Sequence, residues 1–372
     1  MPCSRASAGS PSMTDQFTVS FDSGAEPSTA RVGGKCVGLL TMTGRGIRVP
    51  PGFAVTTDAF AAALDGGGLR AEIRSVLAGL DRSDPADTER RAAEVRGLVT
   101  DRPVPPPVAR AVAAAYRVLG AAGDVQVAVR SSAETEDLPT ISFAGQYDTY
   151  LGVLGADAVV DAVRRCWASL WTARAITYRA AGGVPERGLR MAVGVQRMVD
   201  ARTAGVALTV NPADGDPSKI VIDAAWGLGE PLVSGEVTPD NYVVDKVLLL
   251  PVKTTLSPQH HELVVAPNGH GLLRRAVEDG RRRRACLGPA EVTAVAELAK
   301  RVERHYGCPQ DIEWVIARDA PQLPDGGPRV LLLQTRPETF WSRRPRAKAA
   351  VVPGAGVSSI ADTMLGLGTL PS

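Results

Sequence analysis

Arginine, hydroxyl and carboxylate side chains are concentrated in one stretch of the sequence, residues 127–153. The β-branched run Val127 to Val129 predicts a buried strand, and Arg130, Ser131 and Ser132 follow it. Glu134, Glu136 and Asp137 come next, before a small-residue turn that contains Gly145 and Gln146 and a second apolar run, Tyr147 to Val153. A hairpin of this kind can close its glycine-bearing turn over phosphate oxygens, and an arginine fork suits the same oxygens. The alternative is a surface hairpin with a solvated arginine.

Two segments near the C-terminal end combine carboxylates, an amide and a guanidinium. In Asp311-Ile312-Glu313-Trp314-Val315-Ile316 the polar and apolar residues alternate, so Asp311 and Glu313 share one face of a predicted strand. A second predicted strand, Val330 to Leu333, leads into Gln334 and Arg336, which also share a face. Neighbouring strands would bring all four side chains to one cleft, and such carboxylates suit Mg²⁺, whose remaining positions phosphates can fill. A solvated strand edge is the alternative.

Three more candidates are isolated residues in weaker motifs. Lys35 follows Gly33-Gly34 at a predicted helix start, Gln196 interrupts the apolar strand Met191 to Val199, and Glu230 ends the turn Trp226-Gly227-Leu228-Gly229. Their ordinary interpretations are a solvated lysine, a surface amide and a turn cap. Alternatively, a lysine ammonium binds phosphate and a glutamine amide can pair with an adenine edge.

The length of the chain is enough for one large domain with two lobes, or for two domains. We expect a flexible tail at 1–14, an N-terminal lobe with a helical subregion at 15–190, a C-terminal lobe at 191–342 and a second tail at 343–372. Further expectations are helices within 61–120, one helix over 157–181 with Trp167 and Trp171 in the core, and a helix from Glu291 to Tyr306 ended by Gly307.

Several segments, in order, resemble the nucleotide-binding domain of the dikinase family, which includes phosphoenolpyruvate synthase, pyruvate phosphate dikinase, rifampin phosphotransferase and phenylphosphate synthase. The segments are GGKCVGL at 33–39, GIRVPPGFAVTTDAF at 46–60, residues 127–153, MAVGVQRMV at 191–199, AGVALTVNP at 204–212, AAWGLGEPLVSGEVTPDNYVVDK at 224–246, HYGCPQDIEWVI and LLLQTRPETFW. The resemblance extends from about Arg31 to Trp341. It implies an α+β fold of the ATP-grasp type, with two lobes that hold Mg-ATP between them.

The resemblance also implies roles for the candidate residues. Lys35, Arg130 and Arg336 would be catalytic, neutralising charge on the phosphates; with Gly145, Gln146, Gln196, Glu230 and Gln334 they would bind ATP. Asp311, Glu313 and Gln334 would hold Mg²⁺. A carrier histidine attacks the β-phosphoryl group in the family, AMP leaves, and water or phosphate takes the γ-phosphoryl group.

Family members also carry a swivelling domain with a TSH motif, and the histidines here, His260, His261, His270 and His305, do not follow that pattern. We therefore expect the ATP-binding subunit of a split phosphotransferase, with a separate histidine-bearing swivelling-domain subunit and a small-molecule final acceptor bound elsewhere. The alternatives are a self-contained ATP-grasp kinase or ligase and an ATP-sensing regulatory module.

Composition favours a soluble cytoplasmic protein of 372 residues. There are 42 basic and 40 acidic residues, so neither a nucleic-acid nor a membrane partner is expected. The run Arg281 to Arg284 indicates a solvated face or a docking patch, since no aromatic residues are interleaved. The five cysteines form no CxxC pair, which predicts reduced thiols without a zinc site. No apolar run in the sequence reaches the length of a membrane span.

Overall fold

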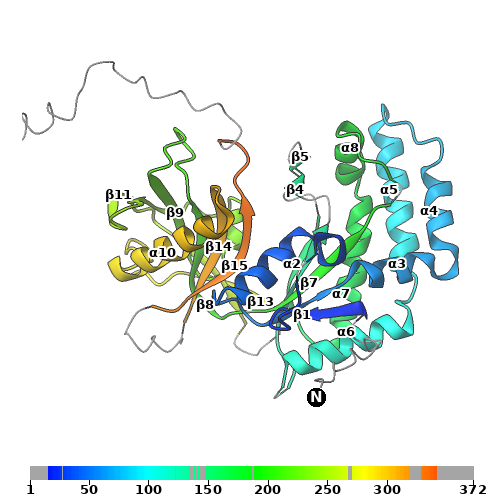
Figure 1. Ribbon diagram of the computed structural model, residues 1–372, viewed down its shortest axis with the longest axis horizontal. Helices are drawn as coiled ribbons and strands as arrows, with labels where there is room; N and C mark the ends of the chain where they lie inside the picture. The colour runs from blue at the N-terminus through cyan, green and yellow to red at the C-terminus, as the bar shows by residue number, and fades with distance from the viewer. Residues whose placement is uncertain are drawn as a thin grey trace, which may run out of the picture.

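The computed structural model describes residues 16–26, 28–121, 123–133, 137–138, 141–142, 147–186, 188–266, 270–318 and 328–341. Two large antiparallel sheets and the helices that cover them make up most of this part of the chain (Figure 1). The α+β fold class is therefore confirmed. The predicted tails at 1–14 and 343–372, and the turn residues Gly145 and Gln146, lie outside the described residues.

The first sheet has five strands in the order β1-β2-β7-β3-β6. They are β1 (Thr18–Ser20), β2 (Gly52–Val55), β7 (Met191–Arg197), β3 (Val127–Ala133) and β6 (Thr149–Val153). The pairing of β3 with β6 confirms the hairpin expected around Arg130. Along β3 every residue is buried except Arg130, which is half-buried. The strand thus presents the cation of Arg130 from an otherwise buried run of residues.

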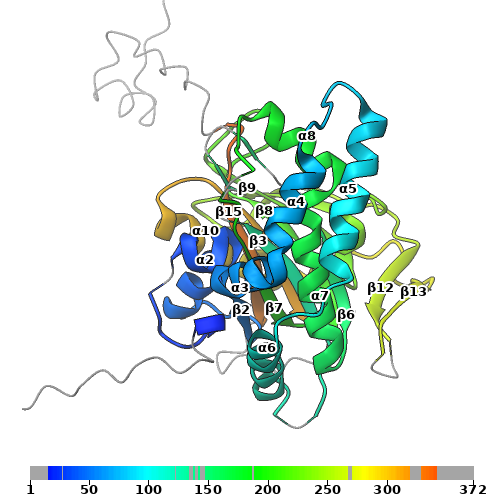
Figure 2. The ribbon, with the colours of Figure 1, turned by 90° about the vertical axis from the view of Figure 1, so that its right-hand side faces the viewer.

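Helices from the first half of the chain cover one face of this sheet (Figures 1 and 2). They are α3 (Thr57–Asp65), α4 (Leu69–Leu77), α5 (Pro85–Thr100), α6 (Pro106–Leu119), α7 (Ala156–Ala168) and α8 (Ala173–Ala181). The apolar core between these helices and the sheet includes Trp167 and Trp171, as expected. The predicted single helix at 157–181 is wrong, because a short 3₁₀ turn, Ser169–Trp171, separates α7 from α8. Thr172 then caps α8 by accepting a hydrogen bond from the Ala175 amide.

The second sheet has six strands in the order β11-β10-β9-β8-β14-β15. They are β11 (Pro251–Thr255), β10 (Asp240–Asp245), β9 (Lys219–Trp226), β8 (Ala201–Leu208), β14 (Gln310–Ala317) and β15 (Val330–Pro337). Helix α10 (Pro289–Tyr306) packs on this sheet and ends, as predicted, at a left-handed Gly307. Trp314 is fully buried in the core between them. A side chain on Gly205 would collide with the Asp223 carbonyl and the Trp314 ring, so this glycine allows the close packing of β8, β9 and β14.

Helix α2 (Thr29–Gly44) joins the two halves, because it packs against β3 and β7 of the first sheet and β15 of the second. The chain passes between the sheets after β7, so the strand Met191–Arg197 belongs to the first sheet. The lobe boundary expected between residues 190 and 191 stays a prediction. Strand β7 pairs with both β2 and β3, so it is the central strand of that sheet.

Three small elements complete the described fold. The hairpin of β12 (His261–Val265) and β13 (Leu272–Ala276) stands out from the body in Figure 2. Strands β4 (Asp137–Leu138) and β5 (Ile141–Ser142) pair with each other, and α9 (Glu230–Val233) is a single turn after β9. Among the helices of the described residues, none combines the length and apolar character needed to cross a membrane.

Candidate functional site

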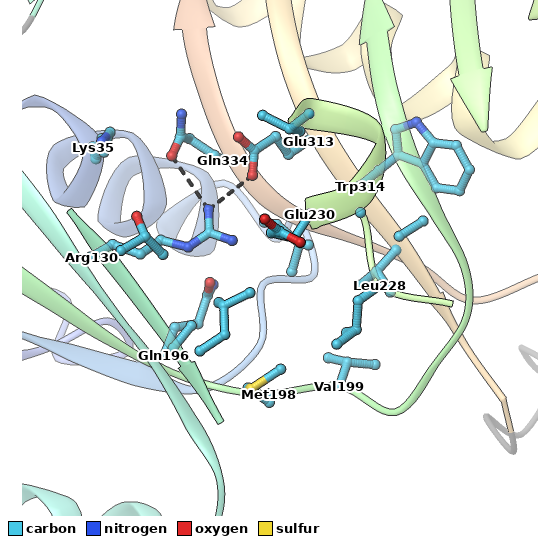
Figure 3. A pocket seen from close by; sticks show the side chains of 18 of the residues that line it. Lys35, Arg130, Gln196, Met198, Val199, Leu228, Glu230, Glu313, Trp314 and Gln334 are labelled. Atoms are coloured by element: carbon cyan, nitrogen blue, oxygen red, sulfur yellow. Dashed lines mark hydrogen bonds and ion pairs between the residues drawn. The ribbon is translucent and has the colours of Figure 1, made fainter. Parts of the chain in front are cut away.

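A cavity of about 440 Å³ lies between the two sheets and is lined by residues of both. The first sheet contributes Arg130 and Gln196, and the second contributes Glu313 and Gln334 (Figure 3). Arg336 of the second sheet also lines the cavity. The volume is within the range of ligand pockets, about 300–1,000 Å³. Polar and charged side chains gather at one end of the cavity and apolar ones at the other, so its shape and chemistry suit an amphipathic ligand.

Lys35 reaches the charged end from α2, at a point where the helix backbone is kinked. Gly33 has φ 71°, and a Cβ atom there would lie 1.8 Å from the Ser132 carbonyl oxygen, so a glycine is required. The Ser132 hydroxyl donates to the Val32 carbonyl and accepts from the Cys36 amide, at 2.9 and 3.1 Å. The sequence Gly33-Gly34-Lys35 is thereby fixed to β3, and Lys35 is held on the same side of the cavity as Arg130.

Arg130 and Glu313 form an ion pair across the cavity. Nη1 of Arg130 donates to Oε2 of Glu313 at 2.9 Å and to Oε1 of Gln334 at 3.5 Å. Burial alone would raise the pKa of Glu313, but the attraction of Arg130, with smaller contributions from Lys35 and Arg336, holds that pKa below its ordinary value. The carboxylate is therefore ionised at neutral pH although only a quarter of its side chain is exposed.

Asp311 and Arg336 form a second ion pair, on the adjoining strands β14 and β15. The register places Asp311 opposite Arg336 and Glu313 opposite Gln334, which confirms that each strand directs alternate residues to one face. Nε and Nη2 of Arg336 donate to Oδ2 of Asp311 at 2.7 and 2.5 Å. Burial raises the pKa of Asp311 despite this arginine. Asp311 does not line the cavity, so it reaches the site through Arg336.

The opposite end of the cavity is apolar. Met198, Val199 and Leu228 line it, and Gln196 lies at its edge (Figure 3). Gln196 is 3% exposed, and its Nε2 has no hydrogen-bond partner among the described residues. A buried amide without a partner costs free energy unless a ligand or water satisfies it. A flat ring that accepts one hydrogen bond fits this end.

Glu230 lines the cavity between its two ends, at the first residue of α9. Burial, and then repulsion from Glu236, raises the pKa of Glu230. Glu230 and Glu313 are the carboxylates among the described lining residues. The described residues contain no group of three or more His, Cys, Asp or Glu side chains placed to hold a metal ion. Mg²⁺ nevertheless fits Glu313 with the Gln334 amide oxygen, since this ion commonly takes one or two carboxylates and completes its shell with phosphates and water.

Comparison with known proteins identifies the family. Residues 29–352 match the model of the pyruvate phosphate dikinase AMP/ATP-binding domain. The chain belongs to this family. The match covers every strand of the two sheets except β1, together with all the residues that line the cavity, and the family description names AMP and ATP as its ligands.

Curated relatives share this dikinase domain. A probable phosphoenolpyruvate synthase of Staphylothermus marinus is 39% identical over 96% of the chain and 46% of its own length. The phosphoenolpyruvate synthase of Aeropyrum pernix is 40% identical over 87% of the chain and 42% of its own length. A rifampicin phosphotransferase of a Streptomyces species is 39% identical over 85% of the chain and 36% of its own length. The chain thus spans less than half of each of these relatives.

The dikinase-family fold brings most of the predicted site residues together. Lys35, Arg130, Gln196, Glu230, Glu313, Gln334 and Arg336 line one cavity, and Asp311 stands behind Arg336. Gly145 and Gln146 lie outside the described residues. The individual roles assigned to these residues stay predictions.

Sequence reasoning missed the apolar lining. Met198 and Val199 were within a segment noted for its resemblance, but only Gln196 was singled out there. The sequence feature that could have pointed to Met198 and Val199 is their position just after the end of β7, where the chain passes from one sheet to the other.

Proposed function

We propose that this dikinase-family domain binds Mg-ATP between its two sheets and transfers the β-phosphoryl group to a histidine supplied by another domain or chain. The observation that carries the proposal is the division of the cavity: Lys35, Arg130 and Arg336 line one end and the apolar residues with Gln196 the other. An adenine ring fits the second end and a triphosphate the first. The size of the cavity and the family membership support the same assignment.

The three cations would act by position and charge. Charge on a transferred phosphoryl group is spread over its oxygens, and fixed positive groups stabilise it without reorganising. Arg130 would exchange part of its contact with Glu313 for phosphate oxygens, while Arg336 is held in place by Asp311. Mg²⁺ bound by Glu313 and Gln334 would neutralise further phosphate charge.

The transfer itself requires a nucleophile from outside the cavity. An imidazole nitrogen bonds to the β-phosphorus, the bond from that phosphorus to the α–β bridging oxygen breaks, and AMP leaves with the electron pair. Water or phosphate then takes the γ-phosphoryl group. None of the chain's own histidines, His260, His261, His270 and His305, lines the cavity. We therefore assign the nucleophile to a carrier histidine on a swivelling domain. That domain is either part of a separate subunit or a further domain of the same protein.

The final acceptor would be a small molecule bound elsewhere. The relatives include phosphoenolpyruvate synthases and a rifampicin phosphotransferase, whose names indicate different acceptors for similar nucleotide domains. The charged and apolar ends of the cavity suit the nucleotide, and the proposal needs no site for the final acceptor in the same cavity. We therefore assign acceptor choice to the parts of the enzyme outside this domain.

Labelled ATP tests the proposal. The chain is incubated with a purified histidine-bearing carrier domain from one of the relatives and either [β-³²P]ATP or [γ-³²P]ATP. We expect the β label on the carrier, AMP as product, and no γ label on the carrier once the transfer is complete. Retention of the γ label with ADP as product would instead identify a simple kinase or ligase. As a control, the carrier is shown to accept the label from its own nucleotide-binding domain. If this chain then binds ATP but forms no product with the same carrier, it is a regulatory module.

A further inference from the structure

The arginine run at 281–284 has no role in the proposed transfer, but its first member is turned inward. Arg281 is 22% exposed, and its guanidinium carbon lies 4.2 Å from the centre of the Trp226 ring. Its Nη1 and Nη2 lie 3.4 and 3.5 Å from the two oxygens of Glu262. Arg283 and Arg284, in contrast, are exposed. The solvated face expected from the sequence therefore does not include Arg281.

Glu262 is a buried carboxylate on the hairpin β12–β13. It is 2% exposed, and Nε of Arg275, directly opposite on β13, donates to it at 2.9 Å. A carboxylate removed from water holds its arginine partners firmly, because breaking such a pair leaves an uncompensated charge. Glu262 thus fixes Arg281 relative to the hairpin.

The backbone of the same hairpin holds the turn that follows β9. Gly227 pairs with Leu263, and the Leu228 amide donates to the Leu263 carbonyl at 2.8 Å. Gly227 has φ 76°, and a Cβ atom there would lie 2.3 Å from that carbonyl oxygen, so only glycine permits the approach. The Trp226 amide is also held, because it donates to Oε1 of Gln259 at 2.8 Å.

The turn fixed in this way is one wall of the cavity. Leu228, Gly229 and Glu230 line the cavity, and Leu228 lies with Val199 and Met198 at its apolar end (Figure 3). At the charged end Lys35, Arg130 and Arg336 come from α2, β3 and β15, and Glu313 comes from β14. The hairpin's hydrogen bond to the first sheet, from Nε2 of Gln126 to the Gly271 carbonyl at 3.2 Å, lies before the start of β3. A displacement of the hairpin would therefore move the apolar wall and leave the phosphate-binding cations in place.

We propose that Arg281 and Glu262 are positioning residues for the base-binding end of the nucleotide cavity. Glu262 holds Arg281, Arg281 covers the Trp226 ring, and the hairpin backbone sets the position of Leu228. The inference rests on the proposed function, because it takes the apolar end as the site of the base. Its consequence is specific: losing Arg281 weakens contacts to the base and spares contacts to the phosphates.

Calorimetric titration of Arg281→Ala tests the inference. Mg-ATP and magnesium tripolyphosphate, which has no base, are titrated into the wild type and the variant, with competition against ATP where the heat of tripolyphosphate is small. We expect Kd for Mg-ATP to rise about tenfold, as loss of a shielded cation–π contact suggests, and Kd for tripolyphosphate to change less than about twofold. Arg283→Ala removes the same charge from the same run and is expected to change neither value.

Other outcomes separate the two proposals. Equal weakening of both ligands, or no weakening of either, overturns the positioning role. A wild-type chain that binds tripolyphosphate as tightly as ATP, or binds neither, overturns the proposed nucleotide site itself. Glu262→Gln, which keeps the shape of the side chain, should repeat the selective loss, and Arg281→Lys should restore most ATP affinity. These two variants carry the test if Arg281→Ala does not fold.

Discussion

Arg130 and Glu313 are 183 residues apart in the sequence, and their side chains meet at 2.9 Å between the two sheets. Arg130 comes from β3 of the first sheet and Glu313 from β14 of the second. The pair therefore ties the two sheets together at the charged end of the cavity. It also keeps a half-buried carboxylate ionised inside the cavity.

Arg130→Met should reveal this pair as a pH-dependent contribution to stability. The lowered pKa of Glu313 means that its contribution is present above the ordinary value of 4.5 and is lost as the pH falls through the lower folded value. Without Arg130 the buried carboxylate loses its main partner, at a cost of about 1–3 kcal/mol near neutral pH. Denaturant unfolding across pH 3–8, roughly the window set by these values, measures the difference.

The difference between wild type and Arg130→Met should shrink as the pH falls below 4.5, because Glu313 becomes protonated in both proteins. Arg318→Met is a matched control, since Arg318 pairs with the half-exposed Asp200. That surface pair should contribute less than about 1 kcal/mol. A constant difference between wild type and Arg130→Met at all pH values would contradict the assigned role of the pair.

Mg-ATP should raise the melting temperature of the chain, and EDTA should abolish most of the gain. A ligand that binds only the folded state stabilises it by about 2.7 kcal/mol at a hundredfold excess over its dissociation constant. Thermal scans with Mg-ATP, with ATP plus EDTA, and with Mg²⁺ alone make the measurement. A flat response of folded protein to millimolar Mg-ATP would be evidence against the nucleotide site.

Arg336→Ala and Glu313→Ala should each slow phosphoryl transfer to a carrier histidine by about 10²–10³-fold, the usual effect of losing one preorganised charged group. The reason is that each residue lines the charged end of the cavity. Formation of [¹⁴C]AMP in the presence of the carrier gives the rate, and circular dichroism checks the fold. Arg301→Ala, at an exposed position on α10, should transfer at the wild-type rate. Near-normal rates in both site variants would refute the assigned roles.

Gln196→Met should weaken ATP binding without lowering the stability of the free chain. The substitution removes a buried amide nitrogen that has no partner among the described residues, so the stability of the free chain should stay equal or rise by up to about 1 kcal/mol. ATP affinity should fall roughly tenfold, because the amide can no longer hydrogen-bond to the base. Unfolding curves and calorimetric titration provide the two values.

Gln310→Met gives the contrast, because its amide donates to the Cys308 and Pro309 carbonyls and accepts from Thr335. This variant should lose stability. If Gln196→Met lost stability without losing ATP affinity, Gln196 would be a structural residue.

The sequence by itself determined the local elements and the faces of the strands. The period of two along β14 and β15 placed Asp311 with Glu313 and Gln334 with Arg336, because successive side chains on a strand point to opposite faces. The end of α10 at Gly307 followed equally from local rules, since backbone conformation at a helix cap depends on near neighbours.

Tertiary structure alone decided which distant residues meet. The break between α7 and α8, the place of β7 in the first sheet and the inward turn of Arg281 depend on packing against elements far along the chain. Local periodicity carries no information about those partners. For the same reason the sequence could propose Arg130 and Glu313 as separate candidates, and only the assembly of the two sheets made them a pair.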